Sequence, residues 1–193
     1  MKIVDMYITM MPVIMGGIFN MLFTRTDLYK GHRTPMDFGR TLKDGKRIFG
    51  EHKTWIGFCS MILFCVVSQV FWGLLLRAFS ASSHSELYNI YENSCVYNVF
   101  AGLLFGFVYM LFELPNSFIK RRLDIPEGRT VSGAKGAVFF IVDQVDSLIG
   151  VMLVLMLLSG ISGKKYFAYV LLGGLTHIAV NLTLYRLKIR KNL

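Results

Sequence analysis

Five long apolar segments constrain this chain more than any other feature of its sequence. A helix that crosses the hydrocarbon core of a bilayer needs about 20 mainly apolar residues, because each residue rises about 1.5 Å and the core is about 30 Å thick. Segments of this kind run over residues 3–23, 55–79, 95–114, 137–159 and 166–185. The sequence therefore predicts an all-α integral membrane protein with about five transmembrane helices. We expect residues 1–193 to form a single membrane-embedded domain.

The Lys and Arg residues, which give a formal net charge of +9, are distributed unevenly between the two sides of these segments. Most of them lie in the loops 24–54 and 115–136 and in the tail after residue 185. Short cytoplasmic loops hold Lys and Arg in excess. We therefore expect a multi-pass protein of the cell membrane with its N-terminus outside, its C-terminus in the cytoplasm, and any charged site facing the cytoplasm.

Two carboxylates lie inside the fourth apolar segment, at Asp143 and Asp146. Residues three apart are neighbours on one face of a helix, so the two carboxylates should point the same way and repel each other. A hard divalent cation would compensate the charge, and Mg²⁺ commonly takes one or two carboxylates together with substrate phosphates. The alternative is that both residues pair with Lys or Arg from neighbouring loops as purely structural contacts.

A polar and basic run follows the third apolar segment. Pro115 disfavours a helical conformation at Leu114, so we expect the helix to end there and a loop to begin. Amide, hydroxyl, ammonium and guanidinium groups can all donate to phosphate oxygens. A basic run just inside a membrane helix is also what the distribution of charge across membranes predicts without any substrate. The candidate phosphate-binding residues of this run are Asn116, Ser117, Lys120 and Arg121.

The loop 24–54 combines regularly placed glycines with hydroxyl groups and Lys53, which is a composition that can bind phosphate. It is not a P-loop. Gly45 and Gly50 have the required spacing, but Glu51 stands where that motif requires Lys.

Four ordered motifs cover most of the chain. They are Pro-Met-Asp-Phe-Gly-Arg at 35–40, Gly-Glu-His-Lys-Thr-Trp-Ile-Gly at 50–57, Asn-Ser-Phe-Ile-Lys-Arg-Arg-Leu-Asp-Ile-Pro at 116–126, and Asp-Gln-Val-Asp at 143–146. Together with Asn20 near the end of the first segment, these motifs resemble the CDP-archaeol synthase family, membrane cytidylyltransferases that are distantly similar to the phosphatidate cytidylyltransferases (CDP-diacylglycerol synthases).

The resemblance implies Mg²⁺-dependent transfer of CMP from CTP to a lipid phosphate of the inner leaflet, which gives a CDP-lipid and pyrophosphate for phospholipid biosynthesis. It also implies that the lipid phosphate attacks the α-phosphorus of CTP directly. By motif, Asp143 and Asp146 would hold the metal and act in catalysis together with Lys120. The implied substrate-binding residues are Asn20, Asp37, Gly39, Arg40, Lys53, Thr54, Asn116, Ser117 and Arg121.

The chain departs from the pattern of the phosphatidate enzymes at two places. It has no His-Gly-Gly, and Gln144 stands where their D-R-x-D motif has Arg. This favours the archaeol-type branch and leaves open whether the lipid chains are ether-linked isoprenoids or ester-linked acyl groups. Glu127 lies nearby as a weak candidate for an additional acidic ligand.

Two other classes of protein were weighed against this function. A small transporter or cation channel could use Asp143 and Asp146, but both lie toward one end of their helix and no internal repeat is visible. A CDP-alcohol phosphotransferase would need a D-G-x-x-A-R motif, which is absent. We expect no nucleic-acid partner.

Five further polar or small residues have structural explanations. The G-x-x-x-G spacing of Gly102 and Gly106 permits close helix packing, which we expect inside the monomer, although a homodimer is possible. His177 and Asn181 are expected to hydrogen-bond across helices, and we expect an ordinary salt bridge at Glu113.

Overall fold

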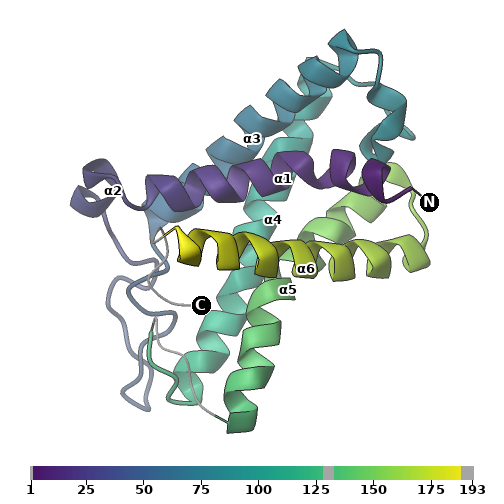
Figure 1. Cartoon of the computed structure of the whole chain (residues 1–193). Helices are drawn as coiled ribbons and strands as arrows, with labels where there is room; N and C mark the ends of the chain where they lie inside the picture. Colours follow the sequence, from purple (N-terminus) through teal and green to yellow (C-terminus); the bar gives the residue numbers. More distant parts are fainter. Residues whose placement is uncertain (1, 128–132, 188–193) are drawn as a thin grey trace.

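Long helices make up most of the computed structural model, which describes residues 2–127 and 133–187. Within those ranges the chain forms no strand, only two isolated bridges in the loop before residue 55. Short elements connect the long helices: α2 (Asp27–Gly31) and the 3-10 turns η1 (Ser82–His84) and η2 (Glu86–Tyr88). The long helices are α1 (Ile3–Phe23), α3 (Trp55–Ala78), α4 (Cys95–Arg122), α5 (Gly133–Ser159) and α6 (Gly163–Arg186) (Figure 1).

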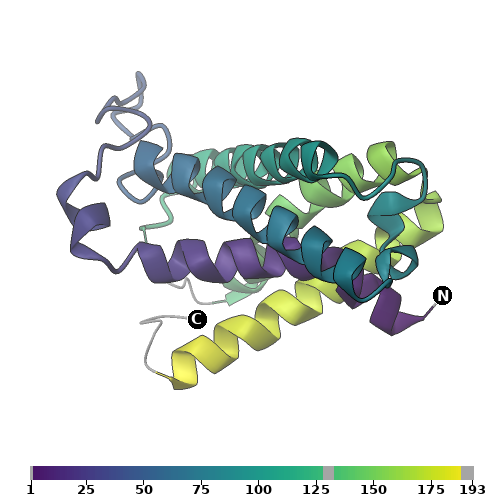
Figure 2. The same ribbon diagram turned by 90° about the horizontal axis from the view of Figure 1, so that it is seen from above.

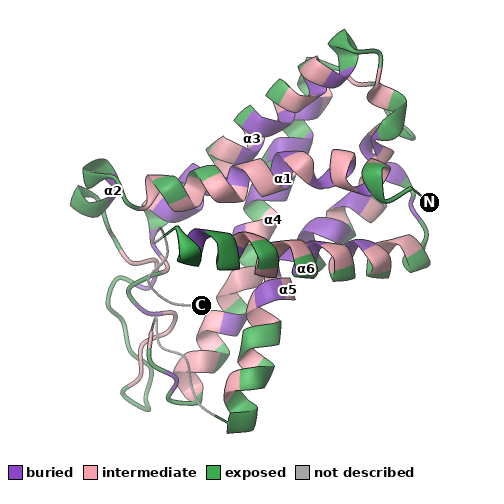
Figure 3. Cartoon of the chain, in the orientation of Figure 1, coloured by how far each residue is buried: buried purple, intermediate pink, exposed green. Residues whose placement is uncertain are grey.

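Each of the five long helices is long and apolar enough to cross a membrane. Large apolar side chains are exposed along their outward faces, where green and pink alternate along the helices in Figure 3. Phe71 on α3, Phe100 on α4 and Leu157 on α5 are exposed by 50%, 50% and 72%. A water-soluble protein rarely exposes so many large apolar side chains together, whereas lipid tails solvate them. The predicted all-α membrane fold with five spans is confirmed.

Hydroxyl side chains cap the start of three membrane helices. Thr54, Ser94 and Ser162 each accept a hydrogen bond from the backbone N–H three residues further on, at the first turns of α3, α4 and α6. Each cap satisfies an N–H group that has no acceptor inside its helix, and it fixes where the helix begins.

The tightest helix contact is that of α3 with α4, and two glycines explain it. A Cβ atom at Gly102 would lie 2.6 Å from Val66 Cα, and one at Gly106 would lie 2.5 Å from Ile62 Cα. Only glycine permits this approach of two backbones. The G-x-x-x-G face is therefore used inside the chain, as predicted.

The prediction that the third helix ends at Leu114 is wrong, and so is the predicted loop 115–136. Helix α4 continues through Pro115 to Arg122, and α5 begins at Gly133 rather than at residue 137. Proline removes only one backbone hydrogen bond, and membrane helices tolerate this because neighbouring helices re-satisfy the freed groups. The polar run that follows Pro115 therefore lies on a helix and faces its neighbours with helical spacing.

The loop between α1 and α3 lies at the same end of the molecule as the end of α4 (Figure 1). Backbone hydrogen bonds from Met36 N to Lys53 O (2.7 Å) and from Trp55 N to Thr34 O (3.0 Å) close the base of this loop. The turns η1 and η2 lie at the opposite end (Figure 1). Two charged regions that are far apart in sequence are thus brought together.

Candidate active site

A cavity of about 500 Å³ opens where the loop before α3 meets α1, α4, α5 and α6. It gathers most of the residues that the sequence predicts for a site. Those that line it are Asn20, Lys53, Thr54, Asn116, Ser117, Lys120, Arg121, Asp143 and Asp146.

The two carboxylates of α5 face α4, where one side-chain amide bridges them. Asn116 Nδ2 donates hydrogen bonds to Asp143 Oδ1 and to Asp146 Oδ2, each at 2.7 Å. One turn further along α4, Lys120 Nζ lies 2.5 and 2.6 Å from the two oxygens of Asp143. The spacing of three residues on α5 does place both carboxylates on one face, and the spacing of four on α4 places their two partners opposite.

The oxygen groups around Asn116 fit a hard divalent cation. Mg²⁺ prefers oxygen ligands and is often held by one or two carboxylates, with phosphates and water completing its shell. Asn116 is 8% exposed, and its Oδ1 atom is buried without a hydrogen-bond partner in the part of the chain that the structure describes. An amide oxygen beside two carboxylates extends the oxygen donor set. No group of three or more Asp, Glu, His or Cys side chains gathers anywhere in residues 2–127 and 133–187, so substrate oxygens would have to complete the shell.

Lys53 reaches the same cavity from the loop and forms a short ion pair with Glu113 of α4. Burial alone would lower the pKa of Lys53, but the Glu113 carboxylate, with smaller contributions from Asp146 and Asp143, raises that pKa above its ordinary value. Lys53 therefore stays positively charged over the whole physiological range. The expected salt bridge of Glu113 is present.

Thr54 and Asn20 line the cavity, and a side-chain oxygen of each is already hydrogen-bonded. Thr54 is 1% exposed, and its Oγ1 atom lies 2.9 Å from the Tyr29 hydroxyl while it caps α3. Asn20 Oδ1 accepts a hydrogen bond from Ser60 Oγ at 2.6 Å, which ties α1 to α3. These contacts shape the wall of the cavity.

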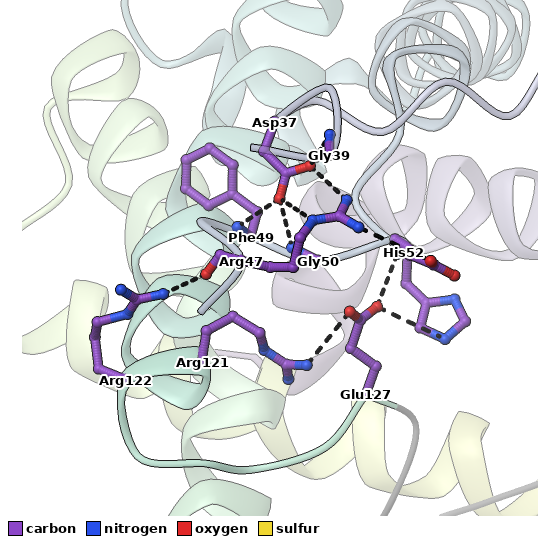
Figure 4. Close-up of polar contacts among 10 residues, drawn as sticks. Asp37, Gly39, Arg47, Phe49, Gly50, His52, Arg121, Arg122 and Glu127 are labelled. Atoms are coloured by element: carbon purple, nitrogen blue, oxygen red, sulfur yellow. Dashed lines mark hydrogen bonds and ion pairs between the residues drawn. The ribbon is translucent and has the colours of Figure 1, made fainter. Parts of the chain in front are cut away.

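Three of the residues predicted to bind substrate, Asp37, Gly39 and Arg40, do not line the cavity. Asp37 is buried and organises the loop from inside (Figure 4): it binds the Arg47 guanidinium, and it accepts backbone hydrogen bonds at 3.0 Å from Gly39, Phe49 and Gly50.

Burial works to raise the pKa of Asp37, but the hydrogen bonds from Arg47 and from three backbone N–H groups hold it well below its usual range. The carboxylate of Asp37 is therefore charged at any physiological pH. Its contacts with Arg47, Phe49 and Gly50 hold the loop before α3 in its folded conformation.

A polar contact across α5 and α6 closes one side of the cavity. Asn181 Nδ2 donates to Gln144 Oε1 at 3.1 Å, and His177 Nδ1 lies 3.4 Å from the Gln144 carbonyl. The predicted hydrogen bonds across helices are confirmed for this pair. Gln144 points away from α4 while its neighbours Asp143 and Asp146 face it.

Sequence reasoning gave little weight to Glu127 and did not use His52, although both line the cavity. Glu127 lies on the segment after α4, where its carboxylate accepts a hydrogen bond from the His52 backbone N–H at 3.0 Å and lies 3.5 Å from Arg121 Nη1. The sequence around Glu127 gave no local signal for this contact, because its partner His52 lies 75 residues earlier in the chain.

One part of the cavity wall is apolar and continues out of the site. It is formed by Val13, Ile14, Gly17, Ile18 and Met21 of α1 and by Val180 of α6. A second hollow, of about 420 Å³, runs between α1 and α6 and shares Ile18, Thr176 and Val180 with the first. Seen from above, α6 crosses α1, and the two helices separate from this crossing toward their C-terminal ends (Figure 2).

Comparison with known proteins gives a consistent result. The CarS-like CDP-archaeol synthase family matches residues 2–193. The chain is 28% identical to the CDP-archaeol synthase of Sulfurisphaera tokodaii over 93% of this chain and 98% of that one. It is 32% identical to that of Archaeoglobus fulgidus over 83% and 84% of the two chains. A solved structure described as an intramembrane enzyme for archaeal membrane lipids biosynthesis superposes with a TM-score of 0.61 at 22% identity, over 91% of this chain and 92% of the other.

Proposed function

The chain belongs to the CDP-archaeol synthase family of membrane cytidylyltransferases, and from this premise we propose that it transfers CMP from CTP to an isoprenoid-type lipid phosphate, releasing pyrophosphate. The observation that carries the proposal is the meeting of Asp143, Asp146, Asn116 and Lys120 in a cavity with one charged wall and one apolar wall. The charged wall suits the triphosphate of a nucleotide, and the apolar wall suits the hydrocarbon chains of a lipid.

Asp143 and Asp146 would hold Mg²⁺, with the Asn116 amide oxygen available beside them. Bound there, the ion would neutralise charge on the phosphates of the nucleotide. The carboxylates are fixed in advance, since the amide of Asn116 and the ammonium of Lys120 hold their oxygens in place. Such preorganisation spares the site from reorganising during the reaction.

The basic residues of the cavity bind and orient phosphates. Lys53, Lys120 and Arg121 reach it from a loop and from α4, so they approach a bound triphosphate from two directions. Transfer of a phosphoryl-type group depends mainly on in-line positioning and on neutralising charge, and no protein nucleophile is needed. We propose that an oxygen of the lipid phosphate attacks the α-phosphorus directly and that pyrophosphate leaves.

The lipid enters this site from the side in our proposal. The Lys- and Arg-rich end of the molecule faces the cytoplasm by the positive-inside rule, so the cavity opens toward the inner leaflet. The apolar hollow between α1 and α6 is continuous with the catalytic cavity through Ile18 and Val180. A hydrocarbon chain in this hollow would leave its phosphate at the charged wall. A homodimer is not required by this arrangement and stays a prediction.

The experiment that tests the proposed function is incubation of purified protein with labelled CTP, Mg²⁺ and a set of lipid phosphates, followed by mass spectrometry of the lipids. We expect a CDP-lipid with an ether-linked isoprenoid substrate and less with an ester-linked one. No CDP-lipid from any lipid phosphate would remove the proposal. Flux of cations through the protein in liposomes without CTP would instead support a transporter.

A further inference from the structure

The carboxylate of Glu127 is held by groups that proteins commonly use to bind phosphate. The backbone N–H of His52 donates to Glu127 Oε2 at 3.0 Å, and the His52 imidazole Nε2 lies 3.9 Å from the same oxygen. The Arg121 guanidinium lies 3.5 Å from Glu127 Oε1 (Figure 4). Two of these groups come from the loop before α3, and the third comes from α4.

A glycine lets the carboxylate rest directly on the backbone. Gly50 has a φ of +101°, and a Cβ atom there would lie 2.2 Å from Glu127 Oε1. Any other residue would fill the space that the carboxylate occupies. On the other side of the same turn, the Gly50 N–H is bound by Asp37, which fixes the shape of the turn (Figure 4). We call Gly50, the His52 backbone N–H and imidazole, and the Arg121 guanidinium the Gly50 cradle.

The chemistry of the Gly50 cradle suits a phosphate group better than a single carboxylate. A backbone N–H beside a positive-φ glycine, a guanidinium and an imidazole together offer more donors than the two oxygens of Glu127 use. Arg121 is 12% exposed, and its buried Nε atom has no acceptor among the described residues. An unused donor on a buried guanidinium points to a ligand with more acceptor oxygens.

The position of the cradle fits the same ligand. His52, Arg121 and Glu127 line the cavity that contains Asp143 and Lys120. Gly50 is buried and does not line that cavity, because the Glu127 carboxylate covers it. Withdrawal of the Glu127 side chain would open the cradle to the cavity.

We propose that the Gly50 cradle is a subsite for the pyrophosphate end of the nucleotide, and that the Glu127 carboxylate competes with the nucleotide for it. This inference rests on the proposed function, because it takes CTP as the ligand. Glu127 then weakens CTP binding, since its carboxylate must leave the donors before phosphate oxygens can take them. The same carboxylate can retake the donors as pyrophosphate departs.

The first test measures the KM for CTP of Glu127→Ala and of the charge-only variant Glu127→Gln. Without the competing carboxylate, the KM for CTP should fall by about fivefold, which corresponds to the loss of one hydrogen bond and one partly exposed ion pair. The matched control is Asp124→Asn, which removes a negative charge three residues away that pairs with Lys46 outside the cavity. An equal fall in KM in the control would show a general effect of charge and overturn the proposal.

The second test asks whether Gly50 makes room for Glu127 alone or also for a phosphate. Gly50→Ala and the double variant Gly50→Ala with Glu127→Ala are compared, with thermal unfolding as a check on folding. If the cradle takes a phosphate, the added methyl group should raise the KM for CTP of Gly50→Ala above that of the native chain. It should also raise the KM for CTP of the double variant above that of Glu127→Ala. If the double variant binds CTP as tightly as Glu127→Ala alone, the glycine serves only Glu127 and the proposal is wrong.

Direct binding of inorganic pyrophosphate separates this inference from the proposed function. Pyrophosphate binding, followed by the shift in unfolding temperature, needs no lipid and no turnover. Tighter binding by Glu127→Ala than by the native chain would support the cradle even if no lipid phosphate were cytidylylated. Equal binding of CTP and pyrophosphate by Glu127→Ala and the native chain would overturn it, because Glu127 would then not compete for the cradle. Weaker binding by Glu127→Ala would also overturn it, because Glu127 would then support the binding of phosphate.

Discussion

At the scale of single residues, Asn116 links the two carboxylates of the site. Its amide nitrogen donates to both carboxylates of α5, and its amide oxygen is buried without a hydrogen-bond partner among the described residues. Two carboxylates three residues apart on one face of a helix repel each other. Asn116 and Lys120 thus allow two acidic side chains to stay together at the edge of the bilayer.

Removing either carboxylate should abolish turnover without unfolding the protein. Asp143→Asn and Asp146→Asn each keep the size of the side chain and remove one charged ligand of the proposed metal, so the rate should fall by at least about a hundredfold. Insertion and folding should be unaffected, because a charge is removed from the membrane rather than added. CDP-lipid formation and gel filtration measure the two effects. Asp27→Asn, which changes an exposed carboxylate on α2, is the matched control.

Asp37 should act through stability and not through direct contact with nucleotide. Its buried side chain binds Arg47, so Asp37→Asn should destabilise the loop by about 3 kcal/mol, the usual effect of breaking a buried ion pair. Hydrogen exchange at residues 36–53 would measure it.

The effect of Asp37 depends on pH in a direction that follows from its lowered pKa. A carboxyl group whose pKa is lower in the folded protein stabilises it fully above the unfolded pKa of about 3.9, and that stabilisation is lost as the pH falls toward the folded value. The difference between the native chain and Asp37→Asn should therefore be constant near pH 7 and shrink below about pH 4. A difference that grows in acid would contradict the assignment.

At the scale of elements, α4 carries the site because it is continuous. It packs its Gly102 and Gly106 face on α3 in its first half, and it presents Asn116 and Lys120 to α5 in its second half. The position of the site residues therefore depends on the seam between α3 and α4.

Gly106→Val should show this dependence. The added side chain would begin 2.5 Å from the Ile62 backbone, and two helix backbones cannot yield as a flexible side chain can, so we expect destabilisation of about 3 kcal/mol or more. Gly31→Ala is the control, because a Cβ at Gly31 meets nothing within 4 Å. Thermal unfolding in detergent compares the two. Equal unfolding temperatures would mean that the α3–α4 seam is looser than the structure has it.

At the scale of the whole molecule, the five helices place a charged wall and an apolar wall around one cavity. The end nearer the loops supplies Lys53, Lys120 and the two carboxylates, and the separation of α1 from α6 supplies the apolar hollow. The Tyr7 and Thr176 hydroxyl groups hydrogen-bond at 3.2 Å across these two helices, beside the same hollow.

Filling the apolar hollow should impair lipid binding selectively. Val180→Trp places a large side chain where the hollow meets the cavity, so the KM for the lipid phosphate should rise about tenfold or more while the KM for CTP stays unchanged. Leu182→Trp, on the same helix but outside both hollows, should leave both constants unchanged. A rise in the KM for CTP alone would place the lipid elsewhere.

The sequence predicts the parts of this fold that depend on local pattern. Apolar length alone predicts the five spans, and helical spacing predicts the common face of Asp143 and Asp146. The continuation of α4 past Pro115 could not be predicted locally, because neighbouring helices decide whether a membrane helix tolerates proline. The role of Asp37 was missed for a similar reason: its partners at Arg47, Phe49 and Gly50 come together only when the loop closes.

The central claim, that Asp143 and Asp146 hold the metal of a bound nucleotide, is tested most directly by anomalous X-ray diffraction from crystals grown with CTP and Mn²⁺ in place of Mg²⁺. Our account predicts a manganese peak within coordination distance of both carboxylates, with nucleotide phosphate between that peak and Lys120. A metal peak away from both carboxylates would contradict it.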